Sequence, residues 1–200
     1  MSVRQKIAYL MPPMIVLSML GVFQAALFIL KDRQLAWYAG FLVYWPVWGV
    51  LYPLLLIGKE NLLSLFRNKV PRGWEWLLFS LPPIMVFLGT MVIRYDPSGL
   101  PTRIILVITS FLTGTLEEIL WRGLFVYLFP KQLVNGYLWP ALWFALWHFA
   151  PGTISNVPTV SLMAGALVLG LCWGLLAYRT GTIRWTALSH ILTGVFRSIM

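Results

Sequence analysis

The chain has 200 residues, of which 60% are hydrophobic and 10% charged, and its mean hydropathy is +0.80. This composition excludes an ordinary soluble domain. Because a membrane-crossing helix needs about 20 apolar residues, the length allows six or seven such helices joined by short loops, in a single membrane domain over residues 1–200. Cys172 is the only cysteine, which excludes a disulfide framework, and the fifteen Lys and Arg residues are scattered, which argues against nucleic acid binding.

Apolar runs of helical length follow one another along the chain. The predicted spans are residues 7–30, 35–58, 74–93, 104–129, 132–150, 159–178 and 183 to the end. The first run is longer than the core of a signal peptide and is interpreted as a retained span. The predicted fold class is therefore all-α: a polytopic transmembrane helical bundle with about seven spans, within a range of six to eight.

Basic residues indicate the orientation of this bundle, because cytoplasmic loops are enriched in Lys and Arg. The strongest marker is the loop that contains Lys59, Arg67, Lys69 and Arg72. With the N-terminus inside, nine Lys and Arg residues lie on the cytoplasmic side and five on the outer side. We therefore expect a cytoplasmic N-terminus.

Three charged residues lie deep in the fourth predicted span: Glu117, Glu118 and Arg122. Each costs about 2.5–3.5 kcal/mol at the centre of a membrane helix unless it is compensated. Glu118 and Arg122 are spaced i, i+4 and can pair along one face of the helix. Glu117 is rotated by about 100° from Glu118 and should point toward another part of the bundle. An unpaired buried carboxyl group of this kind is a candidate general base.

The only two histidines, His148 and His190, also fall within predicted spans. Together with Glu117 they could hold a zinc ion or position and activate a water molecule, and the residues alone leave both mechanisms open. Asp32 and Asp96 lie in loops, so an aspartyl dyad within the membrane is excluded.

Two further protease chemistries are excluded by spacing. The chain has no H-E-x-x-H sequence, which a zinc site on one helix would need. Ser189 directly precedes His190, and adjacent residues of a helix point in different directions, so they do not form a nucleophile and base pair.

Four segments resemble motifs of a known family. The sequence EEILWR spans residues 117–122 and matches EExxxR, and FALWH at 144–148 matches FxxxH. A glycine-bearing helix and turn follow at 170–185, and the last motif is represented by His190. Over about residues 109–193 the chain resembles the CAAX-protease and bacteriocin-processing (CPBP, or Abi) family of intramembrane endopeptidases. Residues 104–200 would form a CPBP-like catalytic core, whereas residues 1–103 carry no motif.

The resemblance implies hydrolysis of a peptide bond by activated water. Glu117 would activate the water with His148, and His190 would help to stabilise the oxyanion. Glu118 and Arg122 would support the site. If a metal is present, the resemblance and the residue types imply zinc held by Glu117, His148 and His190.

The implied setting of the reaction is the lipid bilayer. The partners are membrane lipid and a membrane-associated or prenylated protein or peptide substrate, with no nucleic acid. The expected location is the plasma (inner) membrane of a prokaryote.

The chain departs from the family pattern at two positions. Relatives read HxxxN in the last motif, where this chain has Gly194 in place of the asparagine that contributes to the oxyanion site. Loss of one such donor can reduce the rate by about 100- to 1,000-fold. Relatives also often carry phenylalanine at the position of Ala166.

Two alternative functions follow. Gly194 favours a catalytically impaired family member that acts as a membrane immunity or assembly factor. The deep ionisable residues also fit a small proton-coupled carrier, although the chain lacks the repeated halves of many carriers.

The position of His148 near the outer end of the fifth span requires an adjustment, because Glu117 lies deeper. The span must be tilted, displaced inward or extended through Pro151 and Gly152. We expect irregular, protein-buried backbone around residues 151–158.

Overall fold

The structure is a computed structural model that describes residues 1–92 and 99–199. Over these residues the chain forms helices and turns without strands, as its composition predicts. The helical segments, in which η marks a π-helical turn, are α1 (Val3–Leu30), α2 (Arg33–Tyr44), η1 (Trp45–Leu51), α3 (Tyr52–Ile57), α4 (Lys59–Ser64), α5 (Glu75–Val92), α6 (Leu100–Glu118), η2 (Ile119–Gly123), α7 (Leu124–Leu128), η3 (Val134–Leu138), α8 (Trp139–Trp147), α9 (Phe149–Gly152), α10 (Thr159–Thr180) and α11 (Arg184–Ile199).

The apolar runs of the sequence correspond to these segments, and three runs are divided into consecutive pieces. Within the described residues, four helical stretches are long and apolar enough to cross a membrane: Val3–Leu30, Arg33–Ile57, Leu100–Leu128 and Thr159–Thr180. The chain is therefore an integral membrane protein with an all-helical fold. The apolar part of α5 is shorter, so a count of seven spans stays a prediction. Residue 93, where the third predicted span ends, and Asp96 lie outside the described residues.

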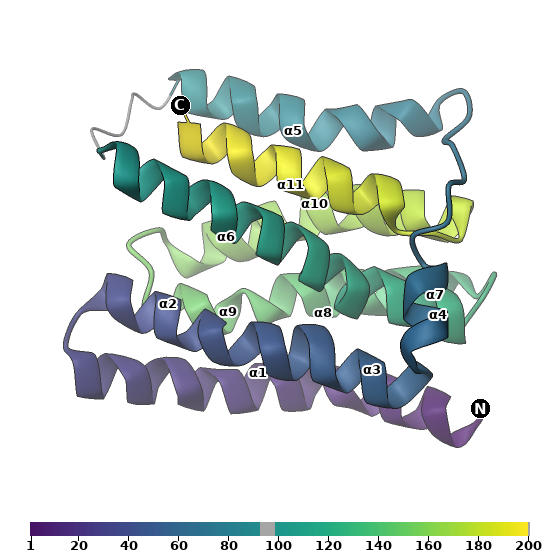
Figure 1. The fold of residues 1–200 in the computed structure, drawn as a ribbon, viewed down its shortest axis with the longest axis horizontal. Helices are drawn as coiled ribbons and strands as arrows, with labels where there is room; N and C mark the ends of the chain where they lie inside the picture. The colour runs from purple at the N-terminus through teal and green to yellow at the C-terminus, as the bar shows by residue number, and fades with distance from the viewer. Residues whose placement is uncertain (93–98, 200) are drawn as a thin grey trace.

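The long helices lie roughly side by side, and the two ends of the chain are at opposite ends of the bundle (Figure 1). Helix α1 packs against α2, α10 packs against α8, and α11 packs against both α5 and α6. This arrangement brings α6, α8, α10 and α11 around one central region, where the candidate site residues lie.

Proline pairs within helices connect neighbouring segments. Tyr9 precedes Pro12 and Pro13 by three and four positions, and since proline has no N–H, neither can donate to the Tyr9 carbonyl. The indole Nε1 of Trp139 donates to this oxygen at 3.3 Å, and the two aromatic rings stack at 4.4 Å. A neighbouring helix thus satisfies a backbone group that would otherwise be unpaired in lipid.

Each end of the bundle is held by contacts between distant segments. At one end Gln5 Nε2 donates to the Leu128 carbonyl at 2.6 Å, and the Ile183 N–H donates to the Leu65 carbonyl at 2.9 Å. The N-terminus of α1 therefore lies with the loops that follow α3, α7 and α10. These segments carry the nine basic residues expected on the cytoplasmic side: Arg4, Lys6, Lys59, Arg67, Lys69, Arg72, Lys131, Arg179 and Arg184.

The segment after His148 continues the fifth predicted span. The chain continues as α9 through Pro151 and Gly152, so the fifth predicted span is extended. The expectation of irregular, buried backbone over residues 151–158 is only partly correct. Residues 151 and 152 are helical and buried, whereas the irregular backbone begins at Thr153 and is exposed at 156–158. The hydroxyl of Thr159 donates to the Gly152 carbonyl at 3.0 Å and so satisfies the end of α9.

Candidate active site

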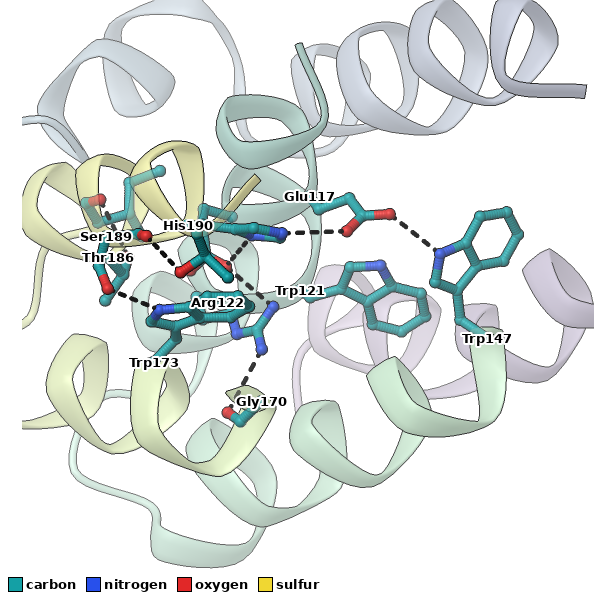
Figure 2. A network of polar contacts seen from close by, with 12 residues as sticks. Glu117, Trp121, Arg122, Trp147, Gly170, Trp173, Thr186, Ser189 and His190 are labelled. Carbon is teal, nitrogen blue, oxygen red and sulfur yellow. Dashed lines mark hydrogen bonds and ion pairs between the residues drawn. The ribbon is translucent and has the colours of Figure 1, made fainter. Parts of the chain in front are cut away.

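Two buried carboxyl groups stand side by side at the end of α6. Glu117 and Glu118 are 1% and 0% exposed. They are the last residues before the π-helical turn η2, a kind of distortion that is frequent at functional sites. Because adjacent helical residues are rotated by about 100°, the two side chains meet different partners. Figure 2 shows Glu117 reaching toward both Trp147 and His190.

Arg122 links three helices around this carboxyl pair. Its Nη1 lies 3.1 Å from Glu118 Oε1, the ion pair that the i, i+4 spacing predicts. Its Nη2 donates to the Gly170 carbonyl at 3.3 Å, and the guanidinium group lies 3.9 Å from the centre of the Phe144 ring. A Cβ atom at Gly170 would lie 2.9 Å from Phe144 Cδ1 and 3.2 Å from Arg122 Nη2, so the glycine permits this close contact. Ala166, one turn earlier in α10, is buried.

The carboxylate of Glu117 is held from one side by an aromatic wall. Its Oε1 accepts a hydrogen bond from Trp147 Nε1 at 3.0 Å. The Trp147 indole stacks on Tyr44 at 4.0 Å, and the Tyr44 hydroxyl accepts a hydrogen bond from Trp121 Nε1 at 2.8 Å. The other oxygen, Glu117 Oε2, is buried, has no hydrogen-bond partner among the described residues, and lies 3.8 Å from His190 Nε2. This oxygen is therefore an unsatisfied hydrogen-bond acceptor among the described residues.

His190 contacts both glutamates. Its Nδ1 lies 3.0 Å from Glu118 Oε1, and its Nε2 faces Glu117 Oε2. An ionised carboxylate only accepts hydrogen bonds, so His190 donates through Nδ1 and keeps Nε2 for Glu117 and its surroundings. The Trp173 indole stacks on the imidazole at 4.0 Å with an interplanar angle of 18°.

The ring of Phe144 lies between His148 and the residues around His190. Its Nδ1 lies 2.7 Å from the Phe144 carbonyl, which can only accept, so Nε2 is the remaining nitrogen. The Phe144 ring lies 4.8 Å from the His148 ring and 6.1 Å from the His190 ring. For the described residues, the structure records no hydrogen bond or ion pair between His148 and Glu117. Glu117, Glu118, Arg122 and His190 thus form one contact network, and His148 lies beside it.

The candidate zinc ligands do not converge on one point. Among residues 1–92 and 99–199, no three His, Cys, Asp or Glu side chains are arranged to hold a metal ion. Glu117 Oε2 and His190 Nε2 face each other at 3.8 Å, whereas the structure records no hydrogen bond or ion pair that joins the described His148 side chain to either of them. The described side chains in this arrangement therefore do not fit a three-ligand zinc site.

The structure gives Gly194 a packing role. A Cβ atom at this position would lie 2.7 Å from Ser110 Oγ and 2.8 Å from Ser110 Cβ. Gly114 faces Ile191 with similar closeness, since its Cβ atom would lie 2.8 Å from the Ile191 backbone nitrogen. Helices α6 and α11 therefore approach closely at both glycines, and Ser110 occupies space into which an asparagine side chain would extend.

Several aromatic residues that surround this network carry no clear signal in the sequence. Trp147 and Trp173 lie inside the motif segments, but tryptophans are frequent throughout the chain. Tyr44 comes from the first half, which carries no motif, and only the folded structure brings it to Trp147. Adjacency to a motif histidine was the signal that could have identified Trp147.

Part of the chain matches a known protein family. Residues 99–196 match the family described as type II CAAX prenyl endopeptidase Rce1-like. The matched segment contains all five candidate site residues. Searches of curated proteins and of solved structures gave no significant match.

Proposed function

Because the chain belongs, through residues 99–196, to the Rce1-like family of type II CAAX prenyl endopeptidases, we propose that it cleaves a peptide bond by glutamate-activated water. The substrate is a membrane-associated or prenylated protein or peptide, and the site lies within the bilayer of a prokaryotic plasma (inner) membrane. The observation that carries the proposal is the pair of atoms Glu117 Oε2 and His190 Nε2, 3.8 Å apart.

A water molecule bound by these two atoms could be activated to attack a peptide carbonyl. Water that donates to Glu117 Oε2 at hydrogen-bond distance lies within reach of His190 Nε2 as well. Glu117 takes the proton as the water oxygen attacks the carbonyl carbon, and the carbonyl electron pair moves to its oxygen. Collapse of this intermediate breaks the C–N bond, and the proton passes from Glu117 to the leaving amine.

The two histidines present similar nitrogens to the reacting group. In both, Nδ1 is bound to an acceptor, which fixes the tautomer and leaves Nε2 for the substrate. In this proposal His148 assists Glu117 in orienting the water. His190, when protonated, donates from Nε2 to the oxyanion. Glu118 and Arg122 hold His190 and the surrounding helices in place.

The environment of Gly194 supports a second candidate function. The contact with Ser110 leaves no room for the asparagine of the family motif, so the oxyanion lacks that donor. A family member with this change could bind a membrane partner as an immunity or assembly factor without cleaving it. Function that persists after loss of Glu117 would favour this alternative.

The test compares two acid-to-amide substitutions in purified protein reconstituted in lipid, with a set of prenylated C-terminal peptides as substrates. Glu117→Gln preserves the shape of the side chain but removes the base, and should lower cleavage by at least about 100-fold. The control is Glu75→Gln, at the start of α5, where Glu75 pairs with Arg179 at 3.1 Å far from the site in sequence. Cleavage by Glu117→Gln at the wild-type rate would show that the proposed base is wrong.

A further inference from the structure

A hydrogen-bonded chain connects His190 to the backbone of α5. Phe79 precedes Pro82 and Pro83 by three and four positions, and neither proline has an N–H to donate to the Phe79 carbonyl. The hydroxyl of Ser189 donates to this oxygen at 2.6 Å. The proline pair thus creates an acceptor in α5, and a side chain of α11 uses it.

Ser189 in turn fixes a tryptophan of α10. Its Oγ accepts a hydrogen bond from Trp173 Nε1 at 2.9 Å. Because the Phe79 carbonyl can only accept, the hydroxyl hydrogen points toward it, and a lone pair remains for the indole N–H. Ser189 and Trp173 are 0% and 1% exposed, so water does not compete for these bonds.

Trp173 transmits this constraint to the imidazole ring of His190. The hydrogen bond from Nδ1 to Glu118 fixes one atom but permits the ring plane to rotate about the N–H to oxygen direction. The indole stacked at 4.0 Å and 18° restricts that rotation. With both contacts, Nε2 is directed at Glu117 Oε2, and Figure 2 shows Trp173 and Ser189 beside the histidine.

We infer that Trp173 and Ser189 are positioning residues that orient the imidazole of His190 toward Glu117, with the proline-freed carbonyl of Phe79 as their anchor. Neither residue touches the reacting atoms. Their effect on cleavage rests on the proposed function, whereas their effect on the histidine ring does not. A displacement of catalytic groups by about 1 Å can lower a rate on the order of 100-fold, so such orientation has a measurable consequence.

The first experiment follows the histidine ring itself by NMR. The chain has two histidines, so selective ¹⁵N and ¹³C histidine labelling gives two sets of ring signals, and His148→Gln assigns them. Stacking on an indole should shift the His190 ring protons upfield. Ser189→Ala should move these signals and broaden them, and Ser189→Thr, which restores the hydroxyl, should recover them. Trp173→Leu should abolish the upfield shift, while Trp173→Phe keeps a stacked ring and should show a partial one.

The control is Trp143→Phe in α8, because the structure records no ring contact between Trp143 and either histidine. Its His190 signals should match those of the wild-type chain. If the His190 signals are also unchanged in Ser189→Ala and Trp173→Leu, the inference is overturned whatever the activity. Should Trp173→Leu fail to fold, Ser189→Ala and Ser189→Thr alone decide the result.

The second experiment measures cleavage with the same variants. Ser189→Ala should lower kcat by about 10- to 100-fold with a smaller change in KM, and Ser189→Thr should recover most of the loss. A change in KM alone would contradict positioning of a reacting group. If the NMR signals move as expected but the wild-type chain cleaves no peptide, the orienting role stands and the proposed protease function fails.

Discussion

At the scale of single residues, the site contains a buried ion pair between Glu118 and Arg122. Both side chains are almost fully buried, and the guanidinium group also contacts the Gly170 carbonyl and the Phe144 ring. A buried ion pair adds little compared with a well-packed apolar pair, but loss of one member leaves an uncompensated charge. The pair is therefore expected to act as a unit.

We predict that Arg122→Met destabilises the protein by about 3–5 kcal/mol, because it leaves Glu118 charged and buried. The double variant Glu118→Gln with Arg122→Met removes both charges and should recover most of this loss. The measurement is the unfolding midpoint of purified protein in detergent. Equal stability of the single variant and the wild-type chain would contradict this account of the site.

The separation of His148 from Glu117 leads to a second prediction. Because the three predicted zinc ligands do not converge, cleavage should continue at the same rate after dialysis against a strong chelator. The measurement is the cleavage rate before and after chelation, together with the metal content of the purified protein. A loss of activity that added zinc restores would show that His148 turns toward Glu117 in the active protein.

At the scale of residues, the sequence predicts how the charged side chains are directed, but it does not predict the aromatic side chains that contact them. Spacing alone predicts the pair of Glu118 with Arg122 and the separate direction of Glu117, since both follow from helical geometry. The Trp147 and Tyr44 contacts depend on how helices from distant parts of the chain pack. No local pattern encodes that packing.

At the scale of helices, the contact between α6 and α11 explains the departure from the family motif. The two helices run antiparallel, since Ser110 faces Gly194 and Gly114 faces Ile191. The two glycines allow the close approach that brings Glu117 and His190 together. Gly194 is therefore part of the packing that forms the site, in addition to being a missing donor.

We predict that Gly194→Asn alone lowers stability, because even its Cβ atom would lie within 3 Å of Ser110. The cost of such overpacking is typically about 1–3 kcal/mol. Adding Ser110→Gly removes the Oγ and Cβ atoms at 2.7 and 2.8 Å and should recover stability. The measurements are the unfolding midpoint and the cleavage rate of both variants.

The double variant also tests the oxyanion site. If the asparagine side chain reaches the reacting carbonyl, the double variant should cleave faster than the wild-type chain. A stable double variant with no gain in rate would show that position 194 no longer faces the oxyanion. A single Gly194→Asn variant as stable as the wild-type chain would contradict the packing role.

The helices themselves are well predicted by apolar runs, but their interruptions are not. The run over 104–129 appears as α6, η2 and α7, and the π-helical turn falls directly after Glu118. The proline pairs at Pro12–Pro13 and Pro82–Pro83 are visible in the sequence, whereas the donors that satisfy the freed carbonyls are not. Those donors come from helices more than 100 residues away along the chain.

At the scale of the whole molecule, the distribution of charge predicts an orientation that the fold makes physically consistent. The nine basic residues expected inside belong to four chain segments, and contacts such as Gln5 with Leu128 and Ile183 with Leu65 bring these segments to one end of the bundle. At the other end, Arg33 donates to the Ser155 carbonyl and Gln24 to the Thr153 hydroxyl. A bundle whose basic loops had been divided between its ends would have contradicted the predicted topology.

We predict that the basic end faces the cytoplasm, because Lys and Arg loops are retained on that side. Two exposed asparagines offer a matched pair of probes: Asn68 in the basic loop and Asn156 in the turn at the opposite end. Each is replaced by cysteine in a Cys172→Ser background, and intact cells are treated with a maleimide that does not cross the membrane. Asn156→Cys should react in intact cells, and Asn68→Cys only after permeabilisation. The reverse pattern would place the N-terminus outside and would require a substrate presented from the outer side.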